Sequence, residues 1–241
     1  MTGSKHEETD TPCQDAKVVR TYGHRWLVAA VADGAGSAVH SASGSSVSVE
    51  SAVSAIDVSL LENDPTDELI GEMLRGSLSE ARRMVEEQAR VMDAELRELA
   101  TTLIVLVACP DWVASAQIGD GAVVIGERDG SLRSLTLPQS GEYINQTTFL
   151  TSGAKDSLAP EIAIHRGDVR RVAAFSDGIQ LLCLKLPDNT PHAGFFEPLF
   201  SLVENAEDAD EAMRKLERFL VSDRVRSLAD DDITLMLAAF R

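Results

Sequence analysis

Short, almost entirely apolar runs mark the predicted strands of this chain. They cover residues 25–32, 101–109, 112–118, 122–127, 131–137, 169–176 and 233–240. Because Gly, Asp and Pro residues separate these runs, each run is typical of a strand that ends in a turn. The nearly unbroken run at 25–32 predicts a buried central strand that forms a hairpin with residues 17–20. The runs between 101 and 137 predict an antiparallel meander.

Apolar side chains spaced by three or four residues predict helices elsewhere in the chain. The spacing is clearest over residues 66–100, where Thr66 or Asp67 is the expected N-cap and Gly71 and Gly76 could bend or split the helix. The small residues of 41–58 predict a helix packed closely against a sheet. Shorter helices are expected at 179–186, 195–204 and 208–222.

The remaining segments complete a picture of one domain. Polar residues 138–165 predict a long surface flap, with a short strand near Ile162. We find no internal repeat and no linker, so residues 1–241 are predicted to form a single domain. The mixture of helices and antiparallel strands predicts an α+β fold whose sheets are covered by helices.

The net charge and the cysteines limit which partners and which cellular compartment are expected for this protein. A net charge of −17 disfavours nucleic acid and anionic membrane surfaces, because both need clustered Lys and Arg. Cys13, Cys109 and Cys183 lie too far apart for a zinc spacing or a disulfide framework. The polar residues 1–17 lack an apolar signal core, and no apolar stretch approaches the ~18 residues of a membrane span. A cytoplasmic protein without nucleic-acid or membrane partners is therefore expected.

Acidic residues at the ends of the apolar runs are the candidate functional groups. Four Asp-Gly pairs begin at Asp33, Asp120, Asp129 and Asp177. Asp129-Gly130, between two short strands, is typical of a hairpin turn. Asp33 and Asp177 instead follow unusually apolar strands, and Asp231 precedes a third. If these strands are neighbours in antiparallel sheets, their three carboxylates converge at one edge.

Converging carboxylates favour a site for a hard divalent cation. They repel one another, and burying them unpaired is costly. Oxygen ligands select Mg²⁺ or Mn²⁺ over zinc. The five histidines, at positions 6, 24, 40, 165 and 192, show no metal-ligand spacing. Helix caps and turns remain the competing explanation of these acids.

The motifs, taken in order, resemble the metal-dependent protein phosphatases of type 2C (PPM). The resemblance covers nearly the whole chain, and its Cys-Gln-Asp-Ala form is similar to a short bacterial subgroup. The matching segments are Pro12–Ala16, Val31–Ser37, Thr101–Leu103, Gln117–Gly121, Ala174–Gln180 and Asp230–Leu235.

The resemblance implies a four-layer α-β-β-α sandwich, two antiparallel sheets flanked by helices, with two Mn²⁺ or Mg²⁺ ions in a cleft at one end. Carried over by motif, Asp33 would bridge both metals and the Gly34 carbonyl would bind one of them. Asp177 and Asp231 would complete the other metal. Asp120 would join Asp177 at a weaker third site. A water bridging two cations would then attack phosphorus in line, without a covalent intermediate.

Several positions depart from the family pattern. Gln14 stands where a Glu is usual, and an amide binds a metal or its water less strongly than a carboxylate. Asp15 is an alternative source of the lost charge. Asp10 stands where an Arg usually clamps phosphate; His6 could replace that Arg or could be a solvated histidine. The chain also lacks most of the strand that usually precedes the first motif, which predicts a shortened N-terminus.

The resemblance implies an enzyme, a metal-dependent serine/threonine protein phosphatase that acts on the phosphoprotein target of a Ser/Thr kinase as a monomer. The alternative is a pseudophosphatase, a module that binds phosphoproteins with weak or no turnover. The changes at Asp10 and Gln14 motivate that alternative. A third interpretation, a Ca²⁺-stabilised β-protein, predicts the same carboxylates but no hydrolysis.

Overall fold

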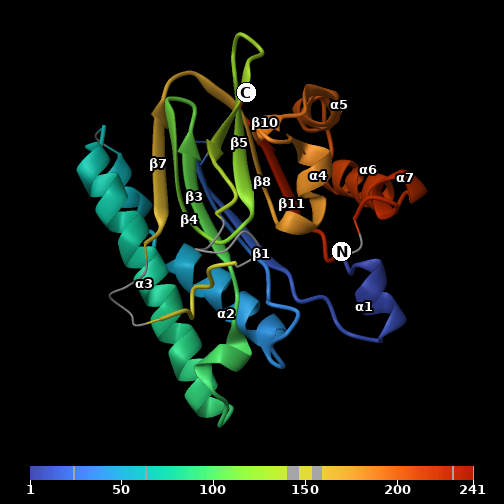
Figure 1. Ribbon diagram of the computed structural model, residues 1–241. Helices are drawn as coiled ribbons and strands as arrows, with labels where there is room; N and C mark the ends of the chain where they lie inside the picture. The colour runs from blue at the N-terminus through green and yellow to red at the C-terminus, as the bar shows by residue number, and fades with distance from the viewer. Residues whose placement is uncertain (24, 63, 140–146, 154–158, 230, 241) are drawn as a thin grey trace.

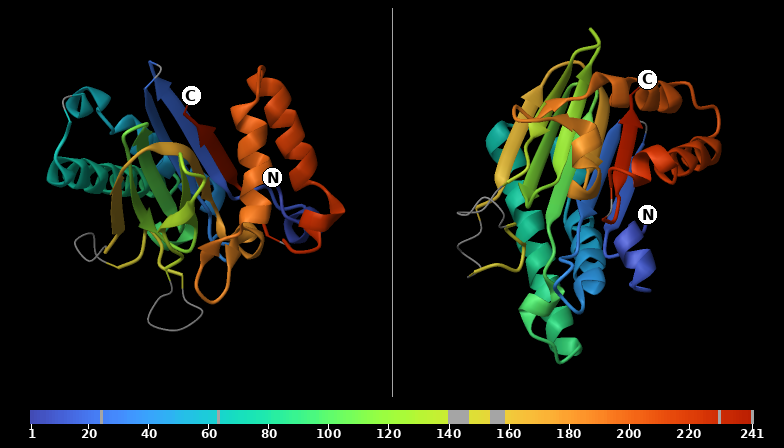
Figure 2. Two further views of the ribbon diagram at one scale, coloured as in Figure 1. Left: turned by 90° about the horizontal axis from the view of Figure 1, so that it is seen from above. Right: turned by 45° about the vertical axis from the view of Figure 1, so that its right-hand side comes forward.

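The computed structural model describes residues 1–241 except 24, 63, 140–146, 154–158, 230 and 241. Two antiparallel sheets lie face to face, and helices cover their outer faces (Figures 1 and 2). The predicted four-layer α-β-β-α sandwich is confirmed. Parts of the expected flap, and Asp230 of the last motif, lie outside the described residues.

The described strands divide between the two main sheets without a shared strand. The five-stranded sheet has the order β1-β2-β3-β4-β7, and the four-stranded sheet has the order β11-β8-β5-β6. The first sheet contains β1 (Ala16–Tyr22), β2 (Trp26–Ala32), β3 (Leu103–Cys109), β4 (Trp112–Ile118) and β7 (Glu161–Arg166). The second contains β5 (Ala122–Glu127), β6 (Leu132–Thr136), β8 (Val169–Phe175) and β11 (Leu235–Ala239). A separate small pair joins β9 (Leu184–Lys185) to β10 (Thr190–Pro191).

Two helices cover each sheet. Helices α2 (Ser41–Ser54) and α3 (Asp67–Val91) cover the five-stranded sheet, and α5 (Ala193–Glu204) and α6 (Ala209–Leu220) cover the four-stranded sheet (Figure 2). The short helices are α1 (Ser4–Glu8), α4 (Gln180–Cys183) and α7 (Asp223–Arg226). Single 3₁₀ turns are η1 (Val58–Leu61), η2 (Leu96–Leu99) and η4 (Asp177–Ile179).

Strand β2 shows why the apolar runs lack polar alternation. Its side chains point alternately to the two faces of the sheet. Trp26, Val28, Ala30 and Ala32 pack in the core under α2 and α3, whereas Leu27, Ala29 and Val31 pack between the two sheets. Because both faces are buried, every position is apolar, as predicted for a central strand. The predicted hairpin with β1 is also confirmed.

The long helical pattern ends earlier than predicted. Thr66 is the N-cap, since its hydroxyl accepts the Leu69 N–H at 3.2 Å, and Gly71 and Gly76 lie inside an unbroken helix. The helix ends at Val91 because Asp93 adopts a positive φ of 53°, and the last predicted turn becomes η2. Apolar spacing does not register such a break, so the prediction of one helix to residue 100 was wrong at its end.

The predicted meander is two hairpins in different sheets. Strands β3 and β4 pair in the first sheet, and β5 and β6 pair in the second. The chain crosses between the sheets at Gly119–Gly121, where Gly119 has a φ of 112°. The short strand expected near Ile162 is β7, which pairs with β4. No helix in the described part of the chain has the length and apolar character needed to cross a membrane.

Candidate metal centre

Acid-bearing loops from both sheets meet at one end of the sandwich. Asp33 follows β2 of the first sheet, and Asp177 follows β8 of the second. Asp120 lies in the loop between β4 and β5 that connects the two sheets. One carboxylate oxygen from each of these three residues lies within 4.8 Å of the others, and all three residues are half-buried. Asp33 and Asp177 therefore converge as predicted, but they come from two sheets rather than one edge, and the third carboxylate of the group is Asp120 rather than Asp231.

Asp15, which precedes β1, joins this cluster. The Ser176 hydroxyl donates to Asp15 Oδ2 at 2.8 Å, and the same hydroxyl accepts the Thr234 N–H at 3.0 Å. Asp15 therefore lies against the segments that carry Asp177 and Asp231. From the sequence, Asp15 was only an alternative source of charge. The preceding residue, Gln14, was aligned with the Glu that is usual in the family.

Burial and mutual repulsion perturb these carboxyl groups. Burial raises the pKa of Asp33, and the charges of Asp15 and Asp177 add to the effect and bring it to about 11. Burial raises the pKa of Asp15 to about 6, although the Ser176 hydrogen bond opposes it. Burial, with the charges of Asp120 and Asp231, also raises the pKa of Asp177. Without cations, these carboxyl groups therefore hold protons more tightly than ordinary aspartates do.

The glycine that follows each cluster acid allows the loops to approach closely. A Cβ at Gly34 would lie 2.8 Å from the Gln14 carbonyl oxygen, and one at Gly178 would lie 2.0 Å from the Asp232 carbonyl oxygen. A Cβ at Gly121 would lie 2.5 Å from the Phe175 carbonyl oxygen. At Gly130, by contrast, φ is +86° and no atom lies within 4 Å, so Asp129-Gly130 is the predicted turn. Close packing distinguishes the cluster pairs from the turn pair.

Hydrogen bonds fix the Asp33 loop to the start of β3. The Asp33 N–H donates to the Thr102 hydroxyl at 2.9 Å, and the Thr102 N–H donates to the Asp33 carbonyl at 2.8 Å. The Thr101 hydroxyl also donates to the Asp33 carbonyl, at 3.0 Å. The backbone of the bridging-aspartate motif is therefore held rigidly by the central Thr-Thr motif.

A buried amide holds the loop that carries Asp120. Gln117 Nε2 donates to the carbonyl oxygens of Gly119 and Gly121 at 3.1 and 2.6 Å, on either side of Asp120. From the flap, the Thr147 hydroxyl donates to Asp120 Oδ2 at 2.6 Å. This contact between the predicted flap and Asp120 was not predicted from the sequence.

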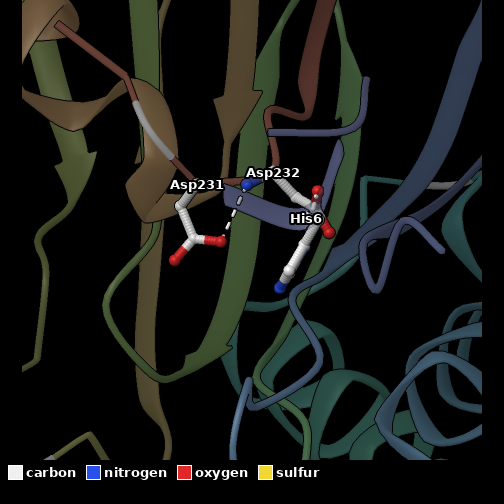
Figure 3. Close-up of side chains that lie close together, drawn as sticks. All are labelled: His6, Asp231 and Asp232. Atoms are coloured by element: carbon white, nitrogen blue, oxygen red, sulfur yellow. Dashed lines mark hydrogen bonds and ion pairs between the residues drawn. The ribbon is translucent and has the colours of Figure 1, made fainter. Parts of the chain in front are cut away.

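A second acidic group, formed by His6, Asp231 and Asp232, lies beside the cluster (Figure 3). Asp232 is 2% exposed, and its carboxylate accepts the Gly3 N–H at 2.7 Å and the Gln14 N–H at 2.6 Å. His6 Nδ1 lies 3.0 Å from Asp232 Oδ1. Burial alone would raise the pKa of Asp232, but the hydrogen bonds from Gln14, Gly3 and His6 outweigh it and lower the pKa.

Asp231 belongs to this second group but also acts on the Asp33 cluster. Its carboxylate is exposed and accepts the Asp232 N–H at 2.8 Å, and its charge acts on Asp177. Its oxygens are not among those of Asp33, Asp120 and Asp177 that lie within 4.8 Å of one another. The structure thus places Asp231 close to the cluster and His6 beside Asp232. A metal-binding role for Asp231 stays a prediction.

The donor set fits hard cations. Asp15 Oδ1 and Asp177 Oδ1 are buried and have no hydrogen-bond partner among the described residues, and the same holds for Gln14 Oε1. Buried oxygens without donors are rare in folded proteins. Carboxylate and amide oxygens without competing nitrogen or sulfur ligands are the donors that Mg²⁺ and Mn²⁺ prefer. Cation binding would relieve both the repulsion and the missing hydrogen bonds.

The sequence of this chain is similar to those of known proteins. The sequence pattern of the family described as protein phosphatase 2C matches residues 2–221. The chain belongs to this family. This 2C phosphatase is 36% identical to serine/threonine-protein phosphatase 3 of Escherichia coli (strain K12) over 248 residues, which cover 98% of this chain and 94% of that protein. The family resemblance found in the sequence, and with it the assignment as a protein phosphatase, is confirmed.

Solved structures share the fold of this chain at low sequence identity. The serine/threonine phosphatase Stp1 from Staphylococcus aureus superimposes with a TM-score of 0.65 at 14% identity, covering 95% of this chain and 90% of that chain. RsbX, solved in complex with magnesium, superimposes with a TM-score of 0.53 at 14% identity, covering 98% and 90% of the two chains.

Proposed function

We propose that this 2C phosphatase hydrolyses phosphoserine and phosphothreonine in proteins with two Mn²⁺ or Mg²⁺ ions, and a weaker third, bound at the Asp cluster. The ligands would be Asp15, Asp33, Asp120, Asp177, Asp231 and the Gly34 carbonyl. The family and the named relative support the reaction, and the magnesium in the RsbX structure supports the choice of metal.

The observation that carries the proposal is the convergence of the half-buried Asp33, Asp120 and Asp177, together with the buried Asp15 Oδ1 and Asp177 Oδ1, which have no hydrogen-bond partner among the described residues. Bound cations would supply a water of lowered pKa as the nucleophile and neutralise charge on the phosphoryl oxygens. The chain's own residues would hold and orient the groups that bind these cations. Bound cations would favour the charged form of Asp33, whose pKa is otherwise raised, while Ser176 orients Asp15 and Thr147 orients Asp120.

Gln14 gives the pseudophosphatase alternative its physical basis. Its buried Oε1 has no partner among the described residues, at a position where a carboxylate is usual in the family. An amide there attracts a cation less strongly, so a protein that binds phosphoproteins without turnover would have the same fold. Asp15, buried against the cluster, supplies a compensating carboxylate, which favours the active enzyme.

The proposed partners of this protein and its proposed cellular compartment rest on the reaction and on the charge of the chain, not on a contact in the structure. A phosphoprotein substrate implies a Ser/Thr kinase that produces it. The net charge of −17 favours a cytoplasmic protein that avoids nucleic acid and anionic lipid, and we propose that it acts as a monomer.

The experiment is hydrolysis of an aryl phosphate and of phosphoserine and phosphothreonine peptides, with Mn²⁺ or with chelator. Asp33→Asn is the test variant, since it removes a cluster charge at constant volume. Asp129→Asn is the matched control, because Asp129 belongs to the Asp-Gly pair in open space. We expect Mn²⁺-dependent turnover that Asp33→Asn abolishes and Asp129→Asn preserves. Binding of phosphopeptides without turnover would instead favour the pseudophosphatase.

A further inference from the structure

The N-terminal residues 1–8 pack directly on the segment that carries Asp231. The Ile233 N–H donates to the Met1 carbonyl at 2.9 Å, and the Gly3 N–H donates to Asp232 Oδ1 at 2.7 Å. Figure 1 shows α1 and the N-terminus beside the start of β11. Arg226 of α7 forms a two-pronged ion pair with Glu7, at 2.9 and 3.1 Å, which fixes α1 from its other side.

Gly3 is the point of closest approach. It is buried, and a Cβ built there would lie 2.3 Å from the Asp231 carbonyl carbon and 2.7 Å from the Asp232 nitrogen. Its φ of −73° is ordinary for any residue. Packing space, not backbone conformation, therefore excludes a side chain at this position.

Asp232 connects three segments through one buried carboxylate. Oδ1 accepts from Gly3 and Oδ2 accepts from the Gln14 N–H at 2.6 Å, one residue before Asp15. The Asp232 N–H donates to Asp231 Oδ1 at 2.8 Å and so orients that carboxylate. Hydrogen bonds to a buried carboxylate are among the stronger ones in proteins. One residue thus sets the relative positions of the backbones that carry two proposed cation ligands.

We propose that residues 1–8 form a clasp that positions Asp231 and Asp15, with Asp232 as the positioning residue through which it acts. Asp232 itself is not one of the proposed cation ligands, because both of its oxygens already accept backbone N–H groups. The clasp acts on the positions of Asp231 and Asp15, and so on the affinity of the site for cations. This inference rests on the proposed function only where it concerns cation affinity.

The test variant is Gly3→Ala, which removes no polar group but forces the clasp away from Asp231. Gly76→Ala is the matched control, because Gly76 lies in the exposed face of α3 with no atom within 4 Å of a built Cβ. We expect Gly3→Ala to weaken Mn²⁺ binding, measured by calorimetry, by about tenfold, the worth of roughly one hydrogen bond to a charged group. At saturating Mn²⁺, kcat should stay within about twofold. Gly76→Ala should match the native protein.

Amide hydrogen exchange without metal gives an independent readout. Exchange at Gly3, Gln14 and Asp232 should accelerate in Gly3→Ala and stay unchanged in Gly76→Ala. Asp232→Asn, which keeps one acceptor oxygen, should give a smaller loss of affinity than Asp232→Ala. Should Asp232→Ala fail to fold, Gly3→Ala and Asp232→Asn carry the comparison.

Two results would overturn the clasp. One is native Mn²⁺ affinity in Gly3→Ala; the other is unchanged exchange at Gln14 and Asp232 in that variant. If the native protein binds no Mn²⁺, the proposed function fails, and hydrogen exchange alone decides whether the clasp positions these segments.

Discussion

Two groups of acids lie side by side in this phosphatase and are satisfied in opposite ways. In the Asp33 cluster, carboxylates face one another, two buried oxygens have no hydrogen-bond partner in the described part of the chain, and burial raises the pKa values of Asp15, Asp33 and Asp177. In the group of His6 and Asp232, backbone N–H groups occupy both Asp232 oxygens, and the pKa of Asp232 is lowered. This difference in hydrogen bonding is why we propose cations at the Asp33 cluster and not at Asp232, since buried oxygens without partners need an explanation.

The largest expected difference between the groups is in turnover. Asp177→Asn should reduce kcat with saturating Mn²⁺ by on the order of a thousandfold, because a catalytic cation is worth several kcal/mol of charge stabilisation. His6→Ala, in the other group, should reduce kcat by less than about tenfold. Steady-state hydrolysis of an aryl phosphate measures both. Comparable losses in the two variants would remove the distinction between the groups.

Stability should change in opposite directions in the two groups. Asp232→Ala leaves two buried N–H groups without an acceptor and should lower the free energy of unfolding by about 3 kcal/mol. Asp33→Asn removes a repelled acid and should raise that free energy by about 1–2 kcal/mol in chelator. Urea unfolding followed by circular dichroism gives both values. A destabilised Asp33→Asn protein would show that the cluster is not strained without metal.

The pH dependence of stability should also distinguish the cluster. Because the folded-state pKa of Asp15 is raised to about 6, its favourable contribution is complete below the unfolded value and is lost as the pH rises through about 6. The loss is at most about 3 kcal/mol. Asp33 extends it to higher pH, since its pKa is about 11. Thermal melts in chelator should therefore fall between about pH 4 and pH 7, and excess Mn²⁺ should raise the melting temperature and flatten the profile. Identical profiles with and without Mn²⁺ would argue against a clustered site.

The smallest predicted change is at Gln14, where the two groups meet: its N–H binds Asp232, and its Oε1 is buried without a partner among the described residues. Gln14→Glu adds a charge near the proposed cations, worth ~1–4 kcal/mol, so the half-maximal Mn²⁺ concentration should fall by about tenfold or more. The maximal rate should change little. A metal titration that overlays that of the native protein would show that position 14 does not tune the cations.

The sequence predicted the parts of this site that strand patterns determine. Asp33 and Asp177 follow apolar strands, so the hydrophobic pattern indicated both as candidate site residues. It predicted their convergence only for neighbouring strands, whereas β2 and β8 lie in different sheets that pack face to face. The clasp was not predictable in this way. Residues 1–17 are polar and lack periodicity, and α1 has only five residues. The partners of Asp232 are backbone N–H groups, which leave no signal in side-chain composition.

The glycines give a second example of what could not be predicted from the sequence. Asp-Gly pairs at residues 33, 129 and 177 are identical as dipeptides, yet two belong to the cluster and one is a turn. The atoms that a Cβ would meet include the Gln14 carbonyl oxygen at Gly34 and the Asp232 carbonyl oxygen at Gly178, both from residues distant in the sequence. Only the tertiary structure separates glycines needed for close packing from those needed for a turn.

The stoichiometry of Mn²⁺ binding tests the central claim most directly. Titration calorimetry on the native protein, Asp33→Asn and His6→Ala compares the two acidic groups without depending on turnover. The account predicts that Asp33→Asn loses the tight Mn²⁺ sites, whereas His6→Ala keeps the native number of sites. The opposite result would contradict the account: if Asp33→Asn bound the native number of Mn²⁺ ions and His6→Ala bound fewer, the cations would bind at His6 and Asp232 rather than at the Asp33 cluster.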